Sequence, residues 1–268
     1  MDLLKFKLTL AYEGTVYSGW QAQKVGLGVQ QKVEEAFACL FKNPVRLHSS
    51  SRTDTGVHAL GMVAHVEIPS DAYRMTEDKL LLAINAHLPE DIRVMALSRA
   101  PHDFHARFDS TGKQYRYMVW NHRAHNPLLT RFAWHVPRPL DISLMREGLS
   151  RLEGTHDFRS FAANRNYPTP DTVRTLYRCD LKKQGPLLTL IIEGNGFLYK
   201  MCRGIAGTIV QCGLKKFPPE EINQILIKKD RRVAGMTAPA HGLVLWKVFY
   251  GNRKGVVLSK TQYSEEDD

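Results

Sequence analysis

The sequence is short of cysteine and has no zinc-type cysteine pair. Its four cysteines are Cys39, Cys179, Cys202 and Cys212, none of them in a C-x-x-C pair or with companion histidines at zinc spacing. This pattern argues against both a structural zinc site and a disulfide framework. Buried free thiols are typical of a reducing compartment, so we expect a cytoplasmic protein.

Long apolar runs are also absent. No stretch is long enough to span a membrane, and the N-terminal MDLLKFKLTLAYEG alternates instead of forming the apolar block of a signal peptide. The sequence has no glycine-rich dinucleotide loop. Asp54 and His58 are four residues apart, and the chain has 11 histidines, but no third ligand accompanies the pair. We therefore expect no membrane association, no cofactor and no metal.

Acidic residues are scarce relative to basic ones. The chain of 268 residues has 37 Lys and Arg against 27 Asp and Glu, a net charge of +10. Four of the acids lie together at 265–268, so the rest of the chain has 37 basic residues against 23 acidic ones, a net +14. This excess favours a polyanionic partner, most often nucleic acid, although a merely basic soluble protein would have the same composition.

Hydrophobic periodicity predicts the element order βαββαβ twice. In the first half we expect strands at 5–12, 45–48, 62–68 and 92–97, and helices at 29–41 and 76–88. In the second half we expect strands at 113–120, 172–181, 187–193 and 243–250, and helices from Asp141 to Gly154, at 199–212 and, as an insertion, at 218–228. A hairpin turn at Gln184-Gly185 joins two of these strands.

The two βαββαβ units define the predicted fold class, which is α+β with two ferredoxin-like halves. We expect their antiparallel sheets to lie side by side, with helices on one face and a catalytic cleft between the halves. The predicted domains are residues 1–105 and 106–251. A polar tail at 252–268 follows them and is a candidate for disorder.

The first stretch that carries chemistry is SSRTDTG, at residues 50–56. Its D-T-G triplet also marks aspartic proteases, in which two carboxylates share a proton. Protease triplets follow an apolar strand and act in pairs, whereas polar residues precede Asp54 and the chain has no second D-T-G or D-S-G. An Asx-turn on its own backbone is the structural alternative for Asp54. Arg52 favours a binding role, because it could hold an anion beside the carboxylate.

Two further stretches combine charge with apolar or aromatic residues. In GKQYRYM, the residues Lys113, Tyr115 and Tyr117 share one face of a predicted strand. Such a face suits stacking on bases with phosphates nearby, and it is equally typical of a half-buried sheet. In NGFLYKMCRGIAGTIV, Arg203 lies in an apolar stretch. Because an arginine there is seldom buried without a partner, a carboxylate is expected beside it, and Asp54 is a candidate.

Together these stretches resemble the tRNA pseudouridine synthase A family. The family's pattern is matched by YEGTVYSGWQAQ, SRTDTGVHA, NAHLPEDIRV, FHARFDSTGKQYRY, FLYKMCRGIAGT and APAHGLVLWKV, which run through all but the end of the chain. The chain departs from the usual pattern at Ser51, Thr55 and Cys202, where the family has Gly, Ala and an apolar residue such as Val. These departures leave Arg52 and Asp54 in place.

The resemblance implies an isomerase that converts uridine to pseudouridine at positions 38 to 40 of the tRNA anticodon stem-loop. The N1–C1′ bond breaks, the uracil turns and C5 bonds to C1′, without cofactor or metal. By the same resemblance Asp54 is the essential catalytic carboxylate, and a paired Arg203 would fix its direction. Tyr115 would stack on the flipped uracil and Arg52 would contact the RNA. The resemblance also implies a homodimer with tRNA lying across both subunits.

Alternatives stay open at this stage. The carboxylate of Asp54 either attacks the nucleotide or takes a proton from the sugar, and the sequence does not separate these routes. A non-catalytic RNA-binding protein could keep the same fold, although the presence of Asp54, Tyr115 and Arg203 argues against it. A synthase that modifies uridines elsewhere in RNA is the second alternative.

Overall fold

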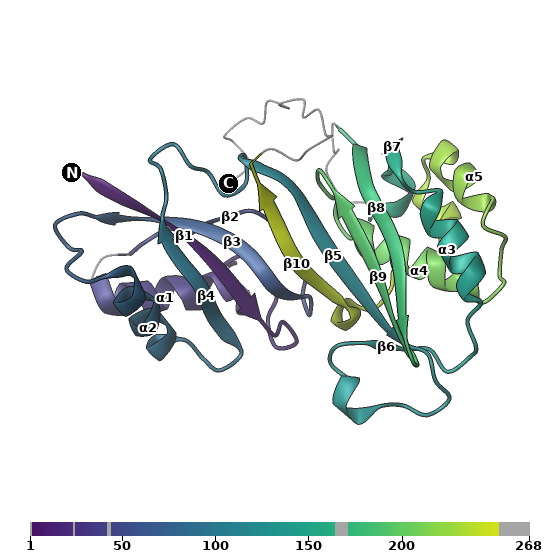
Figure 1. Cartoon of the computed structure of the whole chain (residues 1–268), viewed down its shortest axis with the longest axis horizontal. Helices are drawn as coiled ribbons and strands as arrows, with labels where there is room; N and C mark the ends of the chain where they lie inside the picture. Colours follow the sequence, from purple (N-terminus) through teal and green to yellow (C-terminus); the bar gives the residue numbers. More distant parts are fainter. Residues whose placement is uncertain (1, 24, 42–43, 164–170, 252–268) are drawn as a thin grey trace.

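The computed structural model describes residues 2–23, 25–41, 44–163 and 171–251 (Figure 1). The predicted tail at 252–268 lies outside this part of the chain. The elements of the first half are β1 (Leu3–Tyr12), α1 (Val29–Phe41), β2 (His48–Ser49), β3 (His58–Pro69), α2 (Glu77–His87) and β4 (Ile92–Arg99). Those of the second half are β5 (Ser110–Trp120), β6 (Trp134–His135), α3 (Ile142–Ser150), β7 (Gly154–Asp157), β8 (Val173–Gln184), β9 (Leu187–Gly194), α4 (Met201–Gly213), α5 (Glu221–Lys228) and β10 (Leu243–Tyr250).

The strands form one sheet rather than two. Its order is β4-β1-β3-β10-β5-β9-β8-β7, with β2 paired to β3 and β6 paired to β5. The halves are joined where β10 lies parallel to β3, with Val244 opposite His58 and Leu245 opposite Ala59. The sheets that were expected to lie side by side are therefore joined edge to edge into one continuous sheet. Pairing the two inner edges satisfies backbone groups that separate sheets would leave open.

The helices form one group on each half of the sheet. In Figure 1, α1 and α2 lie together beside the first half, and α2 contacts β4. On the second half α3 packs on α4, α3 contacts β8 and α4 contacts β5. In the described residues, no helix is long and apolar enough to cross a membrane.

Capping residues determine where two of the helices begin. Thr76 caps α2 by accepting a hydrogen bond from the backbone N–H of Lys79, at 3.4 Å. Asp141 caps α3, as predicted, by accepting from the N–H groups of Ser143 and Leu144. This helix ends at Ser150 instead of continuing to Gly154, and the chain turns twice before β7.

Helix α1 and strand β10 have the predicted bounds, whereas β2 begins at His48, where the predicted strand ended. The β8–β9 turn is shifted by one residue. Gln184 pairs with Leu187 in the ladder, so the turn residues are Gly185 and Pro186. Gly185 supplies a φ of +58°, and Pro186 has no N–H to contribute to the ladder.

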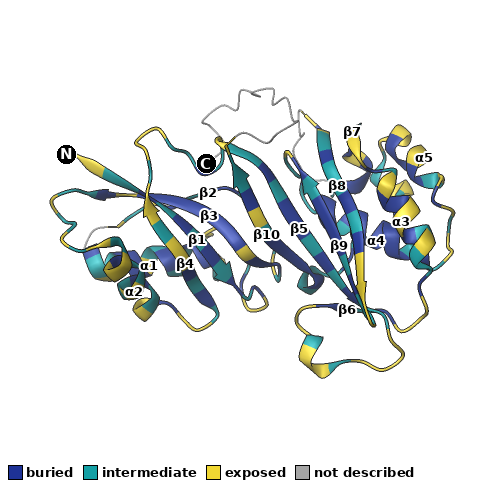
Figure 2. Ribbon diagram, in the orientation of Figure 1, coloured by how far each residue is buried: buried dark blue, intermediate teal, exposed yellow. Residues whose placement is uncertain are grey.

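The core follows the inner side of the sheet. Phe6, Leu8 and Leu10 alternate along β1 and are fully buried, and Val33 and Phe37 of α1 are buried with them. Figure 2 shows burial concentrated in the central strands, while the outward sides of α3 and α5 are exposed. A strand that buries alternate side chains presents the others toward the opposite face, which leaves those positions free for polar contacts.

Candidate active site at the junction of the halves

The loop that carries Asp54 runs from β2 to β3, so it reaches the edge of the first half where the second half begins. The backbone N–H of Val57 donates to the carbonyl of Asp54, at 3.1 Å, and Gly56 has a φ of +75°. The carboxylate of Asp54 is turned toward the other half. Its Oδ2 accepts a hydrogen bond from Nη1 of Arg203, at 3.1 Å. The ion pair that the sequence led us to expect is therefore present.

Residues of the YEGTVYSGW motif form hydrogen bonds with the Asp54 loop. The N–H of Trp20 donates to the carbonyl of Thr53, at 3.2 Å, and the hydroxyls of Tyr12 and Thr53 lie 2.8 Å apart. Gly19 has a φ of +103°, and a Cβ there would collide with the carbonyl oxygen of Thr53. The glycine thus permits close contact between two backbone segments, and this contact limits the movement of the residue next to Asp54.

Arg203 is positioned by the first turn of α4. Its Nε donates to the carbonyl of Ala238, at 2.8 Å, and the N–H of Ala238 donates back to the carbonyl of Arg203, at 3.0 Å. A Cβ at Gly204 would collide with the carbonyl oxygen of Phe161, so only glycine lets α4 pack so closely there. The Arg203 and Asp54 side chains are 15% and 18% exposed. The pair is therefore held on both sides but remains accessible.

Tyr115 lies beside this pair on β5. Its side chain is buried, and its ring meets the ring of Phe197 edge-on, with centroids 5.1 Å apart. Burial raises the pKa of the Tyr115 hydroxyl well above its ordinary value, and negative charge on Asp54 acts in the same direction. The hydroxyl therefore stays protonated and can donate a hydrogen bond, but it is a poor source of phenolate. Arg52 is exposed on the loop, two residues before Asp54.

His58 lies four residues after Asp54, and the sequence alone suggested no role for it beyond that of a metal ligand. It is buried, and its Nδ1 accepts a hydrogen bond from the N–H of Gly14, at 2.9 Å. Its Nε2 lies 2.7 Å from the carbonyl of Arg131 and 3.1 Å from that of His241. Burial lowers the pKa of His58, which favours the neutral ring with its proton on Nε2. The histidine therefore connects both halves, and its backbone partners leave no sequence signature.

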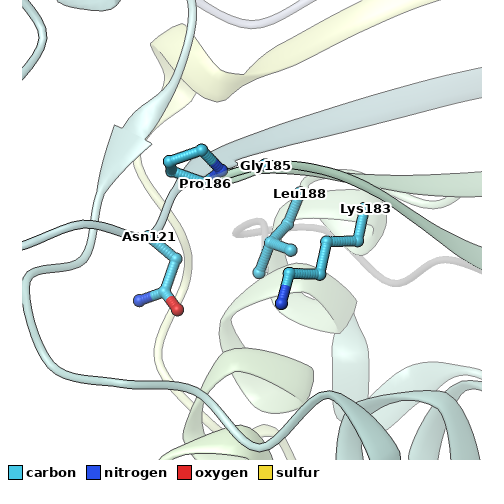
Figure 3. Close-up of a pocket in the computed structure, with 5 residues that line it drawn as sticks. All are labelled: Asn121, Lys183, Gly185, Pro186 and Leu188. Carbon is cyan, nitrogen blue, oxygen red and sulfur yellow. The ribbon is translucent and has the colours of Figure 1, made fainter.

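The described residues contain no group of three or more His, Cys, Asp or Glu side chains that could hold a metal ion. A pocket of about 310 Å³ lies elsewhere, lined by Asn121, Lys183, Gly185, Pro186 and Leu188 (Figure 3). The Asn121 amide is fully engaged, because its Nδ2 donates to the carbonyls of Val136 and Arg138 and its Oδ1 accepts from the N–H of Leu140. The pocket therefore belongs to the loop structure at the hairpin end, not to the Asp54 site.

Comparison with known proteins bears on the family of the chain. A model of the tRNA pseudouridine synthase family matches residues 9–109 and 149–251. The chain is 44% identical over 248 residues to the tRNA pseudouridine synthase A of Geobacillus kaustophilus, covering 92% of this chain and 94% of that protein. It is 41% identical over 253 residues to that of Exiguobacterium sibiricum, covering 94% and 99%. The chain therefore belongs to the tRNA pseudouridine synthase family.

Proposed function

We propose that this protein is an isomerase that converts uridine to pseudouridine in tRNA. The observation that carries the proposal is the ion pair between Asp54 and Arg203, which a member of this family brings together from two halves of the chain. A carboxylate fixed in a partly exposed junction is suited to act on a nucleotide that enters from outside. The relatives that the chain matches over most of its length are named tRNA pseudouridine synthase A.

The reaction conserves the atoms of the nucleoside. The N1–C1′ bond breaks, the uracil rotates, and C5 bonds to C1′ while the C5 proton leaves and N1 gains one. Asp54 starts this sequence, either by attacking the nucleotide or by removing a sugar proton, and Arg203 directs the carboxylate. The target base must leave the helical stack, at a cost of a few kcal/mol. Tyr115 then supports the flipped uracil, and Arg52 contacts the RNA on the exposed side of the loop.

We infer that the target lies in the anticodon stem-loop, at positions 38 to 40. The test uses tRNA transcripts with tritium at C5 of uridine, because C5–C1′ bond formation must release that tritium to water. Purified protein should release it, and pseudouridine mapping of the product should place the modification in the anticodon arm. Modification at uridines elsewhere would support the alternative specificity. Binding without tritium release would support a non-catalytic RNA-binding protein.

We further propose that each half is a ferredoxin-like domain, at residues 1–105 and 106–251. The strand orders support this division. In the first half β4, β1 and β3 are adjacent with β2 on β3, and in the second half β10, β5, β9 and β8 follow in the corresponding order. Each set is the order of a split βαβ unit. The parallel contact of β3 with β10 would then be the joint between two domains.

We also propose that the protein works as a cytoplasmic homodimer with tRNA across both subunits. The net charge of +10 supports a long positive track, and two subunits would lengthen it. Light scattering should give about 61 kDa, twice the chain mass of 30.5 kDa. The logarithm of tRNA affinity should fall with the logarithm of salt concentration by roughly 0.7 to 0.9 per phosphate contact. A monomer that modifies tRNA at full rate, or affinity nearly flat with salt, would contradict the proposal.

A further inference from the structure

Lys113 is a half-buried cation whose side chain has no acidic partner among the described residues. In the part of the chain that the structure describes, no hydrogen bond or ion pair holds its Nζ. Burial lowers the pKa of Lys113 to about 8, and the guanidinium groups of Arg107 and Arg174 act in the same direction. An ammonium group withdrawn from water without a counter-charge is unfavourable, so residues of this kind are seldom found without a partner.

Two arginines, Arg107 and Arg174, lie close enough to Lys113 to act on its charge. Arg174 has an acidic partner, because its Nη1 lies 3.2 Å from Oδ2 of Asp171. Lys113 therefore adds a positive charge without an acidic partner among the described residues, near the guanidinium groups of Arg107 and Arg174, and an anion from outside could neutralise it.

The position of Lys113 connects this charge to the candidate active site. Lys113 and Tyr115 are two residues apart on β5, so their side chains share a face and their Cα atoms are separated by about 7 Å. Opposite Lys113 on β9 is Gly194, and Phe197, on the chain that continues from there, meets the Tyr115 ring. Arg174 borders the same segment, with its Nε 3.4 Å from where a Cβ of Gly196 would be. A strand of RNA with one base at Tyr115 would bring a backbone phosphate to this place.

We propose that Lys113, assisted by Arg107 and Arg174, binds a single phosphodiester of the RNA next to the nucleotide that is held at Tyr115. This inference rests on the proposed function, because it takes an RNA nucleotide to be the occupant of the Asp54 site. The phosphate contact adds binding and alignment of the strand, while the reaction itself stays with Asp54. Lys113 is thus a substrate-binding residue outside the set predicted from the sequence.

The test pairs a protein variant with a chemical change in the RNA. Lys113→Met removes the charge and keeps the length of the side chain, and Lys182→Met is the control because Lys182 is exposed on β8. The parent protein and both variants are titrated with anticodon stem-loop RNAs in which one phosphate at a time, around the target uridine, is an uncharged methylphosphonate. At one position the replacement should weaken binding to the parent and to Lys182→Met by about tenfold, and should not weaken binding to Lys113→Met.

A salt series and a melting experiment complete the test. The slope of log affinity against log salt should decrease by about 0.7 to 0.9 in Lys113→Met, the value for one phosphate contact. The melting temperature of Lys113→Met should be equal to or above that of the parent, because an unpaired desolvated charge is removed. A lower melting temperature with an unchanged salt slope would overturn the proposal and make Lys113 a structural residue. Loss of affinity in Lys113→Met at every methylphosphonate position equally would also overturn it.

The failure of this proposal can be separated from failure of the proposed function. If the parent releases tritium from C5-labelled uridine but Lys113→Met shows no position-specific effect, only the phosphate contact is wrong. If the parent binds the stem-loop without releasing tritium, the isomerase assignment is wrong, whatever the methylphosphonate series shows. The parent protein is therefore assayed for both tritium release and binding in each experiment.

Discussion

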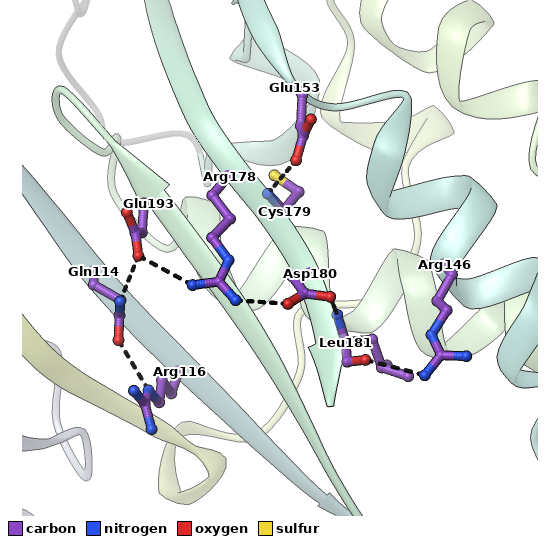
Figure 4. Close-up of polar contacts among 9 residues, drawn as sticks. All are labelled: Gln114, Arg116, Arg146, Glu153, Arg178, Cys179, Asp180, Leu181 and Glu193. Atoms are coloured by element: carbon purple, nitrogen blue, oxygen red, sulfur yellow. Dashed lines mark hydrogen bonds and ion pairs between the residues drawn. The ribbon is translucent and has the colours of Figure 1, made fainter. Parts of the chain in front are cut away.

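The two faces of strand β5 differ in whether their cationic side chains have partners within the protein. On one face Nε of Arg116 donates to Oε1 of Gln114, at 2.9 Å, and Nε2 of Gln114 donates to Oε1 of Glu193, at 2.5 Å. The guanidinium of Arg116 also lies 3.6 Å from the centroid of the Trp246 ring. Arg178 continues the network, because it donates to Asp180 at 2.7 Å and lies 3.8 Å from Glu193 (Figure 4). The cations of this face are compensated within the protein.

The opposite face carries Lys113, Tyr115 and Tyr117. The hydroxyl of Tyr117 donates to the carbonyl of Pro239, at 2.8 Å, and is thereby committed to structure. Tyr115 is instead buried beside the junction, and the half-buried Lys113 has no counter-charge among its described neighbours. Two residues of similar type, Arg116 and Lys113, therefore have different roles. A charge satisfied inside the fold stabilises it, whereas a charge left uncompensated is available to a ligand.

Among the substitutions at the junction of the halves, Asp54→Asn should have the largest effect on the reaction rate. The amide keeps the shape of the carboxylate but can neither attack the sugar nor take its proton, so we expect tritium release to fall at least a thousandfold. The affinity for tRNA should stay within a few-fold of the parent value. Asp230→Asn is the matched control, since Asp230 forms an ion pair with the exposed Arg232. Turnover of Asp54→Asn above about a hundredth of the parent rate would remove Asp54 from the chemistry.

Tyr115 should show intermediate effects that separate its ring from its hydroxyl. Tyr115→Phe keeps the ring, so RNA binding should be normal while the rate falls by about tenfold, the equivalent of one hydrogen bond. Tyr115→Leu loses the aromatic surface as well, so binding should weaken and the rate should fall by about a hundredfold. Single-turnover assays at saturating and limiting protein give the two quantities. If Tyr115→Leu were as active as the parent, neither the ring nor the hydroxyl would matter.

The lowered pKa of Lys113 predicts that the affinity for stem-loop RNA depends on pH. Its pKa of about 8 in the free protein means that Lys113 loses its charge as the pH rises through that value. The affinity for stem-loop RNA should therefore fall above pH 8, by at most about tenfold per pH unit. Titrations at pH 7 and pH 9 measure the change. If the affinity of Lys113→Met fell equally between pH 7 and pH 9, the pH dependence would belong to another group.

The smallest effect should come from the compensated face. Arg116→Met removes the contacts with Gln114 and Trp246 but leaves the junction untouched, so kcat/KM should stay within about threefold of the parent value. The free energy of unfolding should decrease by about 0.5 to 1.5 kcal/mol, as for the loss of a partly exposed cation–π contact and one hydrogen bond. A kcat loss above tenfold with a normal melting curve would break the contrast between the two faces.

Local signals in the sequence predicted most of the elements. The apolar stripe of α1 and the cap of α3 act within a few residues, so they can be recognised without knowledge of the fold. The joint between the halves could not be predicted in the same way. Its two residue pairs, Val244 with His58 and Leu245 with Ala59, connect strands far apart in the sequence, and the alternation within either strand does not indicate which edge it will meet.

In the candidate site, too, the features with a local signal in the sequence were predictable and the others were not. An arginine in an apolar stretch requires a carboxylate, and this requirement suggested the contact between Arg203 and Asp54. His58 was not recognised, because its partners are backbone groups and any residue can provide them. Lys113 was noticed only for its place beside aromatic residues. Whether an acid lies near it depends on the fold and cannot be read from the sequence. The roles of Asp54, Tyr115, Arg203 and Arg52 in catalysis and binding remain predictions.

The place of β10 in the sheet has a consequence for synthesis on the ribosome. β10 lies between the halves, yet about 180 residues separate it in sequence from β3, its neighbour across the joint. At about 5 to 20 residues per second, the inner edge of β3 waits roughly 10 to 40 s for its partner strand. A nascent chain that stops before residue 243 already contains Asp54, Tyr115 and Arg203 but lacks the strand that unites them. Completion of translation and assembly of the candidate active site are thereby coupled, and a prematurely terminated product would expose the same edge to chaperones and proteases.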